Sequence, residues 1–270
     1  MKLVCVARFV PDGDWMDPFG NSHSTIPGEI TIRDGCRRRL CPDDAAALGF
    51  ALSLRQQIPD LSLHLLALAT PAAILQIEDI LRLGVDRATL LPEMIMATSD
   101  TVTLAKMVGS TLPAADYDWI LTGSDTHGHA AAPLAPALAG VLGIDHLSGI
   151  CRIDDTRFTK HHGELERREG RFVTRYAVRG PAILGFDARS DYAMPYLRIK
   201  DRAKDVSHRL RCPGDMIEGP EEANTQPCDA VIRLTGLMKR QKRRKNPRKV
   251  DLNDEGIAQV YHYLCEERLI

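Results

Sequence analysis

The stretch LSLHLLALATPAAILQIEDILRLGVDRATLL, residues 61–91, predicts a strand, a helix and a second strand in succession. Its apolar run Leu61–Ala69 is typical of a strand that is buried on both faces. Thr70 and Pro71 suit a helix N-cap and a first-turn proline. The helix that follows should carry three apolar residues on one face, namely Ile74, Ile77 and Leu81. Arg87–Leu91 then returns as a strand, so the stretch predicts one β-α-β unit of a parallel sheet.

The same alternation of strands and helices extends from this unit across residues 1–188. Further strands are expected at Lys2–Val10, Tyr117–Thr122 and Pro181–Ala188, with a hairpin at Glu164–Val178. Further helices are expected at Asp43–Gln57, Val102–Leu112 and Ala130–Leu142. The pattern predicts an α/β fold, a doubly wound and mostly parallel sheet of the adenine-nucleotide-binding type, with helices on both faces.

Such sheets bind ligands in the crevice at the carboxyl ends of their strands. The candidate binding loops are therefore Pro11–Leu40, Ala69–Pro71 and Gly123–Ala132. Dinucleotide and P-loop motifs are missing from the sequence, as are the serine-hydrolase and zinc-protease motifs. His127 and His129 lack a neighbouring carboxylate or cysteine cluster, so polar contacts to a ligand or an interface are favoured over a metal site. The sequence does not indicate a self-contained enzyme.

The composition is that of a soluble globular protein. The 270 residues are 44% hydrophobic and 26% charged, with a net charge of −1. This balance gives no case for a nucleic-acid or membrane binder, and no apolar run reaches the roughly 18 residues of a membrane span. The start MKLVCVARFVPDG is interpreted as a mature cytosolic N-terminus. Seven widely spread cysteines favour a reducing compartment over a disulfide framework.

The charge is unevenly placed along the chain. Residues 1–188 carry 18 cations and 23 anions, whereas the rest carries 17 cations and 13 anions. Residues 212–229, CPGDMIEGPEEANTQPCD, have the composition of a linker. We therefore expect a compact domain at 1–188, a connecting segment at 189–211 and an extended C-terminal arm at 212–270.

Two features of the arm suggest a partner. The first is a helix at Leu252–Leu264, whose apolar stripe must cover a surface of the body or of another chain. The stripe consists of Leu252, Ile257, Val260, Tyr261 and Leu264. The second is the run KRQKRRKNPRK, Lys239–Lys249, with eight cations in eleven residues. RNA and an anionic membrane are alternatives for this run, but it lacks aromatic residues and an apolar face, which favours a solvated stretch or a docking patch for an acidic protein.

Seven motifs in order resemble the β subunit of electron transfer flavoproteins. MKLVCVARFVPD resembles that family's first strand and Val-Pro-Asp turn, and CPDDAAALGFAL stands at its Asn-Pro-Phe segment. LRLGVDRATLL, SDTVTLAKMV, YDWILTG with APALAGVLGI, and ERREGRF with GPAILGF follow in the family order. MPYLRIKDRAK resembles its recognition segment, which ends in Lys-Ala-Lys. The resemblance covers about residues 1–205.

The resemblance implies an electron carrier without acid, base or nucleophile chemistry of its own. The family forms an αβ heterodimer with one FAD held mainly by the α subunit, and the β subunit usually buries an AMP. Electrons would pass from a flavin-dependent dehydrogenase to a quinone-linked acceptor, and the arm would wrap the α subunit. Segment 189–211 would hold the partner-recognition loop, with Leu197 at the docking leucine and with Arg202 and Lys204 at the Lys-Ala-Lys. The compartment implied is the bacterial cytoplasm or the mitochondrial matrix.

The resemblance also implies cofactor contacts. The residues concerned are Val6, Cys41, Pro42, Ala69, Gly123, Asp125, His127, His129 and Ala131. Several positions depart from the family: Cys41 replaces Asn, Asp43 replaces Phe and Ala131 replaces a hydroxyl residue. Pro133 replaces Gln and has no N–H to donate, and Asp125 would repel a phosphate if its side chain pointed into the crevice. Three contents of the crevice therefore stay open, namely AMP, a second FAD as in electron-bifurcating relatives, or nothing.

Two further hypotheses belong to other classes of protein. One is a stand-alone adenine-nucleotide-binding domain without flavin. The other, weaker one is a nucleic-acid-binding protein that uses the basic run. Co-purification separates the first from an electron carrier, since a carrier subunit should be yellow only together with its partner.

Overall fold

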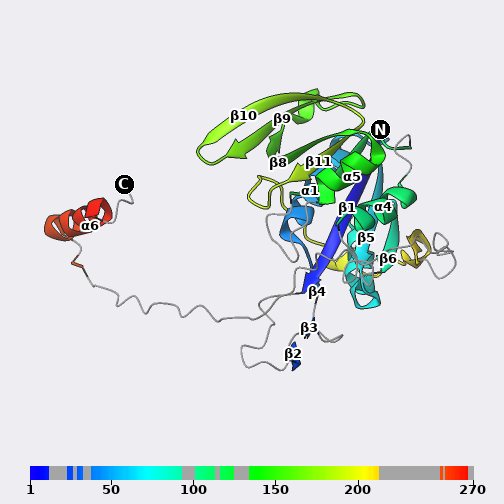
Figure 1. Cartoon of the computed structure of the whole chain (residues 1–270), viewed down its shortest axis with the longest axis horizontal. Helices are drawn as coiled ribbons and strands as arrows, with labels where there is room; N and C mark the ends of the chain where they lie inside the picture. The colour runs from blue at the N-terminus through cyan, green and yellow to red at the C-terminus, as the bar shows by residue number, and fades with distance from the viewer. Residues whose placement is uncertain are drawn as a thin grey trace. The chain divides into compact units, whose positions relative to one another are not determined.

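The computed structural model describes most of the chain. The described residues are 1–11, 23–26, 29–32, 38–92, 101–112, 116–124, 134–212, 250–251 and 253–266. The chain divides into two compact units, Met1–Val231 and Ile232–Ile270, which are described separately (Figure 1).

Ten strands in the described part of the first unit form one sheet. Their bounds are β1 Lys2–Pro11, β4 Arg38–Leu40, β5 Ser62–Ala69, β6 Arg87–Pro92, β7 Trp119–Gly123, β8 Asp145–Ile153, β9 His162–Glu169, β10 Phe172–Arg179, β11 Ala182–Phe186 and β12 Leu210–Arg211. The order is β10-β9-β8-β11-β7-β1-β5-β6-β12, with β4 against β1. In this spatial order, every pair of neighbouring strands from β8 through β11, β7, β1, β5 and β6 to β12 is parallel. The pairs β8–β9, β9–β10 and β1–β4 are antiparallel. A separate hairpin joins β2 His23–Ile26 and β3 Glu29–Ile32.

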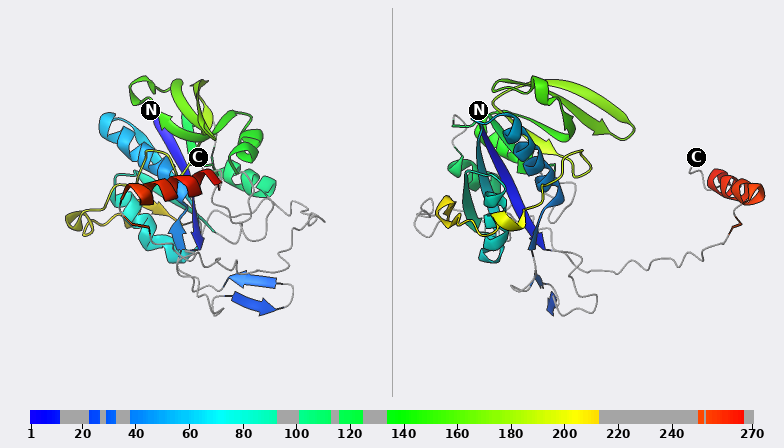
Figure 2. Two further views of the ribbon diagram at one scale, coloured as in Figure 1. Left: turned by 90° about the vertical axis from the view of Figure 1, so that its left-hand side faces the viewer. Right: turned by 180° about the vertical axis from the view of Figure 1, so that it is seen from behind.

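Helices cover both faces of the parallel strands (Figure 2). One face carries α1 Pro42–Gln57 and α2 Ile74–Arg82, and the other carries α4 Thr101–Thr111 and α5 Leu134–Leu142. Side chains of β1 alternate between two apolar cores because successive residues of a strand point to opposite faces. Leu3, Cys5, Ala7 and Phe9 pack toward α1 and α2, whereas Val4 and Val6 pack toward α4 and α5.

The predicted α/β class, with a mostly parallel sheet and helices on both faces, is confirmed. Two local expectations are wrong, and one strand was not predicted. Thr70 makes no side-chain capping bond, and a 3-10 turn at Pro71–Ala73 precedes α2. Tyr117 lies before β7 rather than inside it. Strand β8 is missing from the predictions because DHLSGICRI mixes exposed and buried residues and has no continuous apolar run. Of the predicted helix Ala130–Leu142, the part before Leu134 lies outside the described residues.

The second unit contains helix α6, Asp254–Glu266. Asn253 begins it, because its Oδ1 accepts the Gly256 N–H at 2.8 Å. Its apolar residues Ile257 and Tyr261 stay 67% and 63% exposed. The helix at the C-terminal end is thus confirmed, whereas the extended path of the arm stays a prediction. None of the helices among the described residues has the length and apolar character that a membrane span requires.

Candidate functional site

The carboxyl edge of the parallel sheet meets the start of α1. Cys41 precedes the helix, and its N–H donates to the Arg8 carbonyl of β1 at 2.9 Å. Pro42 occupies the first turn, where its missing N–H costs nothing. Asp43 and Asp44 follow in the same turn, where the helix dipole favours negative charge. The sequence therefore places two carboxylates at the ends of the central strands.

Asp44 joins α1 to two strands. Its Oδ2 accepts the backbone N–H and the Nε–H of Arg8, both at 2.9 Å, and its Oδ1 lies 3.2 Å from Arg8 Nη2. Oδ1 also accepts the Gly123 N–H of β7 at 2.6 Å, and Thr122 Oγ1 lies 3.4 Å away. Asp44 is 1% exposed. The oxygens of this buried carboxylate are thus occupied by donors from two strands, so they are not available to a ligand.

Asp43 makes the equivalent connection to the next strand. Its Oδ1 accepts the N–H of Ala188, just after β11, at 2.7 Å. The backbone of Gly123 passes so close that an added Cβ would lie 2.5 Å from Asp43 Cβ and 2.6 Å from Asp44 Oδ1. Only glycine leaves room for this approach. Together the two aspartates lock the ends of β1, β7 and β11 to α1.

The electrostatics of the cluster are those of a structural ion pair. Burial disfavours the Arg8 charge, but Asp44 more than offsets it, so the pKa of Arg8 lies above its ordinary value. Burial is the largest cause that raises the pKa of Cys41, with the Asp44 charge second, and Arg8 opposes both. The Cys41 thiol therefore stays neutral and is not an activated nucleophile.

The structure brings some of the predicted cofactor residues together. Cys41 and Pro42 start α1, Ala69 ends β5 and Gly123 ends β7, all at the carboxyl edge. Val6 is 1% exposed within the apolar core toward α4 and α5. The predictions for Asp125, His127, His129 and Ala131 fall outside the described residues. A cofactor role for any of these residues stays a prediction.

The described strand ends offer few free backbone donors to the phosphate of an AMP, and the loop at 125–133 lies outside the described residues. A phosphate at such an edge is bound by backbone N–H groups. Here the N–H groups of Arg8 and Gly123 donate to Asp44, and that of Ala188 donates to Asp43. The next N–H, that of Ser124, donates to the Phe186 carbonyl at 2.8 Å. The Asp43 carboxylate at this edge would also repel a phosphate, whereas the charge of Asp44 is paired with Arg8. Sequence reasoning missed the part played by Asp44, although two acids beside a first-turn proline were visible.

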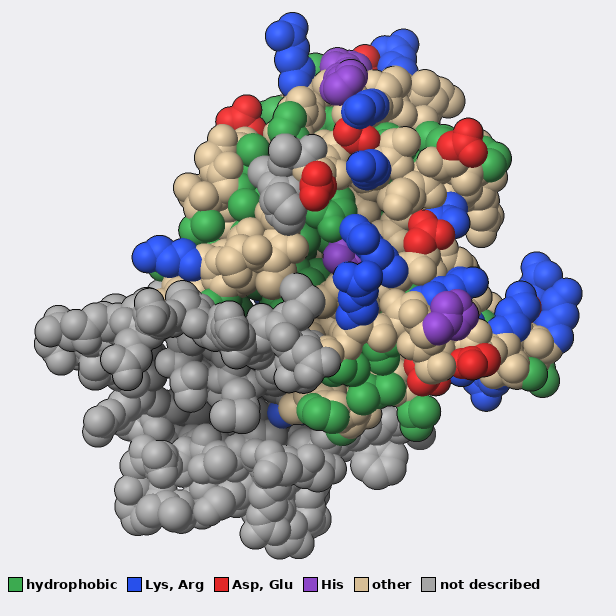
Figure 3. All heavy atoms as spheres, turned by 90° about the vertical axis from the view of Figure 1, so that its right-hand side faces the viewer, with side chains coloured by type: hydrophobic (Ala, Val, Ile, Leu, Met, Phe, Trp, Pro, Cys, Tyr) green, Lys and Arg blue, Asp and Glu red, His purple; other side chains and the backbone are tan. Residues whose placement is uncertain are grey.

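The expected docking segment, residues 189–211, exposes other apolar side chains than Leu197. Leu197 is partly buried, whereas its neighbours Tyr196 and Ile199 are 98% and 88% exposed. Arg202 is exposed, and Lys204 pairs with Asp201 at 2.7 Å. Figure 3 shows Lys and Arg side chains gathered on a projection at the right edge of the face in view. The large exposed apolar side chains of the segment are therefore the two neighbours of Leu197, and a docking role for Leu197 stays a prediction.

Comparison with known proteins agrees with the fold. A family model described as the electron transfer flavoprotein domain matches residues 30–190. "Protein FixA" of Azorhizobium caulinodans is 29% identical over 193 residues, which are 68% of this chain and 65% of that protein. "Electron transfer flavoprotein subunit beta" of Thermoanaerobacterium thermosaccharolyticum is 24% identical over 156 residues, 57% of this chain and 56% of that protein. "Protein FixA" of Bradyrhizobium diazoefficiens is 28% identical over 192 residues, covering 68% and 62%.

Each match thus spans less than two thirds of the relative's own length. The family model nevertheless covers more than half of this chain, and its range runs from within β3 to residue 190, just after β11. That range contains both aspartates of the carboxyl edge and the glycine that they contact. The chain therefore belongs to the electron transfer flavoprotein family.

Proposed function

We propose that this chain is the β-type subunit of a heterodimeric electron transfer flavoprotein. It would carry electrons from a flavin-dependent dehydrogenase to a quinone-linked acceptor, through an FAD held mainly by an α-type partner. The observation that carries the proposal is the family match over residues 30–190, with relatives named FixA and electron transfer flavoprotein subunit beta. The bound FAD supplies the redox chemistry, and the chain supplies surfaces.

The described residues support a role without acid–base chemistry. Asp43 and Asp44 are held by backbone and arginine donors at the carboxyl edge. His64 is held between Tyr117 and Thr89. Each of these buried groups is occupied in holding the fold. In this proposal, the surface around Cys41 and Pro42 at the carboxyl edge covers a flavin held by the partner. This cover would limit the access of water and oxygen to the flavin.

Helix α6 supports the need for a partner. A groove of about 580 Å³ lies along it, and its lining includes Val250, Ile257, Val260, Tyr261 and Leu264. Within its own unit this apolar face is not covered, since Ile257, Val260 and Tyr261 remain 45–67% exposed. An amphipathic helix of this kind docks in an apolar groove of another chain. We propose that the α-type subunit carries the apolar groove into which α6 docks.

The recognition segment would dock on the dehydrogenase. Tyr196 and Ile199 offer two large, nearly fully exposed apolar side chains. Arg198, Lys200 and Arg202 surround them with positive charge. An apolar anchor inside a charged rim suits a transient complex that forms by electrostatic steering. We propose Tyr196 and Ile199 as the anchors in place of Leu197, and a reducing compartment such as the cytoplasm as the location.

The test is co-purification of the tagged chain from its host, followed by a visible absorption spectrum and a count of released nucleotides. The expected eluate contains a second subunit in equal amount and one FAD per heterodimer. The nucleotide count decides whether AMP is present, because three strand-end N–H groups donate to Asp43 and Asp44, while the loop at 125–133 lies outside the described residues. A second equivalent of FAD would instead indicate an electron-bifurcating relative. A colourless, well-folded monomer would refute the heterodimer and favour the stand-alone nucleotide-binding domain.

A further inference from the structure

A polar network lies in the amino-terminal half of β5 and β6, away from the carboxyl edge. Its two rings, His64 and Tyr117, are only 6% and 8% exposed, and 2.7 Å separates His64 Nδ1 from Tyr117 Oη. On the other side of the imidazole, Nε2 lies 3.0 Å from Thr89 Oγ1. Arg87 Nη2 donates to Tyr117 Oη at 3.2 Å. This His64 network therefore runs from a charged arginine, through two buried rings, to a hydroxyl group.

The donors and acceptors of the His64 network decide where its hydrogen atoms lie. Arginine can only donate, so Tyr117 Oη accepts from Arg87. Burial, and after it the charges of Arg87 and Arg211, lowers the pKa of His64 from 6.5 to about 4, so the imidazole is neutral at pH 7. If Nδ1 carried its hydrogen, the buried Tyr117 hydroxyl would lack an acceptor among the described residues. We therefore assign the hydrogen to Nε2, which donates to Thr89 and leaves the Thr89 O–H to donate elsewhere.

A second arginine lies beside that hydroxyl group. β12 pairs with β6 in parallel, and the pairing sets Arg211 opposite Thr89. Successive side chains of a strand alternate between faces, so Arg87 and Thr89 share one face of β6, and Arg211 lies on that face too. Both arginines are exposed, and neither belongs to an ion pair among the described residues. Asp86, which precedes Arg87, pairs instead with Arg55 of α1, the helix that covers the other face.

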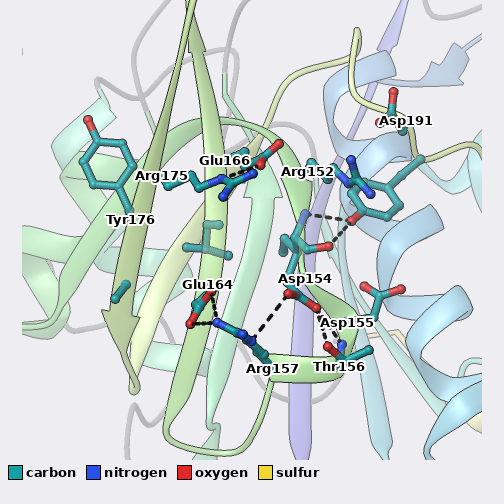
Figure 4. A pocket seen from close by; sticks show the side chains of 14 residues that line it. Arg152, Asp154, Asp155, Thr156, Arg157, Glu164, Glu166, Arg175, Tyr176 and Asp191 are labelled. Carbon is teal, nitrogen blue, oxygen red and sulfur yellow. Dashed lines mark hydrogen bonds and ion pairs between the residues drawn. The ribbon is translucent and has the colours of Figure 1, made fainter.

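The arginines of the large cavity lined by β8, β9 and β10 show a different arrangement. This cavity has a volume of about 970 Å³, and its lining includes Arg157 and Arg175 (Figure 4). Arg157 Nη1 lies 2.8 Å from Glu164 Oε1, and Arg175 Nε lies 3.0 Å from Glu166 Oε1. Each of these guanidinium groups has a carboxylate of its own chain. The two arginines beside the His64 network have none in the part of the chain that the structure describes, and like charges on neighbouring strands repel each other.

We propose that this face binds the phosphate group of a phosphate monoester between Arg87 and Arg211. Guanidinium groups match the oxygens of a phosphate and bind them through parallel N–H groups. The Thr89 hydroxyl adds a third donor, which the hydrogen order of the His64 network leaves without an acceptor. Three donors suit the three terminal oxygens of a phosphate monoester better than the two oxygens of a carboxylate. The site uses residues of this chain alone, so it does not depend on the proposed heterodimer.

Isothermal titration calorimetry with inorganic phosphate tests the site on the full chain, in the form in which it purifies and at constant ionic strength. R87Q and R211Q should each weaken phosphate binding at least about tenfold, the loss expected for a hydrogen bond to a charged group. The control R157Q removes an exposed arginine that already has a carboxylate partner. It should change the affinity less than about twofold. Equal affinities of R87Q, R211Q and the parent chain would overturn the proposal, as would absence of binding to the parent chain.

Thr89 and His64 separate a built site from a general effect of charge. T89S keeps the hydroxyl group and should keep the affinity, whereas T89V should weaken phosphate binding at least about threefold. Bound phosphate opposes the charges of the two arginines, so it should raise the pKa of His64 and increase the protonated fraction at pH 5. NMR of the histidine imidazoles measures that fraction. An unchanged His64 signal at saturating phosphate, or equal binding by T89V and T89S, would overturn the site.

The phosphate group has two natural sources, a soluble metabolite and a lipid headgroup. Glycerol 3-phosphate and vesicles of phosphatidic acid mixed with phosphatidylcholine carry the same monoester in these two forms. Competition of glycerol 3-phosphate with inorganic phosphate assigns the soluble form. Vesicle binding that both R87Q and R211Q abolish assigns the lipid form. Vesicle binding that survives both substitutions, together with no binding of glycerol 3-phosphate, would overturn the proposal.

Discussion

The Oδ1 atom of Asp44 lies 2.6 Å from the backbone nitrogen of Gly123, although 79 residues separate the two along the chain. This contact joins the first turn of α1 to the last residue of β7. Because the same carboxylate also holds Arg8 of β1, the ends of two central strands depend on one side chain. The carboxyl edge of the central strands is therefore held by a buried ion pair.

Asp44 should be one of the most sensitive positions in the chain. D44A removes an ion-pair partner of Arg8, whose side chain is only 13% exposed, and takes away the Asp44 oxygens that accept the N–H groups of Arg8 and Gly123. Breaking a buried pair of this kind costs about 3–5 kcal/mol of unfolding free energy. The matched control is D79A, because the Asp79 side chain is 48% exposed and Arg82 keeps its second ion pair, to Glu78; it should cost less than about 1 kcal/mol. Urea unfolding measures both, and equal losses would contradict the assignment.

Gly123 should not tolerate a side chain. In G123A the new Cβ would meet Asp43 Cβ at 2.5 Å and Asp44 Oδ1 at 2.6 Å, so α1 or β7 must move. We expect a loss of about 1–3 kcal/mol, the usual range for overpacking. G140A is the control, because a Cβ there meets no atom within 4 Å on helix α5. It should raise stability by up to about 1 kcal/mol. Thermal unfolding of the two variants should therefore shift in opposite directions.

The sequence predicts the fold correctly where the local pattern of residues is enough to determine a helix or strand. The acids and apolar residues of DDAAALGFALSLRQQ predict a helix at Asp43–Gln57, and α1 spans Pro42–Gln57. β8 was missed because it joins the parallel strands to the exposed hairpin, so its burial varies along its length. Hydrophobic periodicity predicts a strand only where one face of the strand, or both, is buried along its whole length.

The candidate site was harder to predict because its contacts cross the sheet. Asp43 could be identified as a departure from the family pattern, but its bond to Ala188 joins residues 145 positions apart. The exposure of Tyr196 and Ile199 likewise depends on the path of the backbone through residues 189–211, and the amino-acid composition of that segment does not predict it. Local periodicity therefore predicts elements well and predicts long-range partners poorly.

The buried imidazole of His64 makes the stability of the chain depend on pH. Its Nδ1 lies 2.7 Å from Tyr117 Oη and its Nε2 lies 3.0 Å from Thr89 Oγ1. Burial, with a smaller effect of Arg87 and Arg211, lowers the pKa of His64 from 6.5 to about 4. As the pH falls, His64 therefore binds its proton in the unfolded chain before it does so in the folded chain. The free energy of unfolding is highest above pH 6.5 and decreases as the pH falls toward about 4.

The variant H64Q should remove this dependence. Between pH 7 and pH 4.5 the parent chain should lose about 2 kcal/mol more unfolding free energy than H64Q does. The control is H161Q, because His161 is exposed. Its pH dependence should match that of the parent chain. Urea titrations at several pH values measure the difference, and parallel curves for the parent chain and H64Q would contradict the prediction.

The recognition segment should depend on Tyr196 and Ile199 more than on Leu197. Y196S and I199S remove exposed apolar anchors without disturbing a core, since the two side chains are 98% and 88% exposed. Each should slow flavin reduction by the host dehydrogenase at least about fivefold, which is the size of a moderate interface contact. L197A should slow it less. Stopped-flow reduction of the yellow heterodimer gives these rates, and a larger effect of L197A would restore the leucine as the anchor.

The apolar face of α6 should be required for assembly. I257D and V260D place a charge on side chains that line the groove of this helix. If the α-type partner covers that face, each charge must be buried without a counter-ion, and burying an unpaired charge is strongly unfavourable. Q259D carries the same new charge on the same helix, but residue 259 is not part of the groove lining, and it should leave assembly unchanged. Co-purified partner per tagged chain is the readout. Full recovery of a yellow heterodimer with I257D and V260D would show that the partner binds elsewhere on the chain, whereas loss with Q259D as well would point to a general effect of charge on the arm.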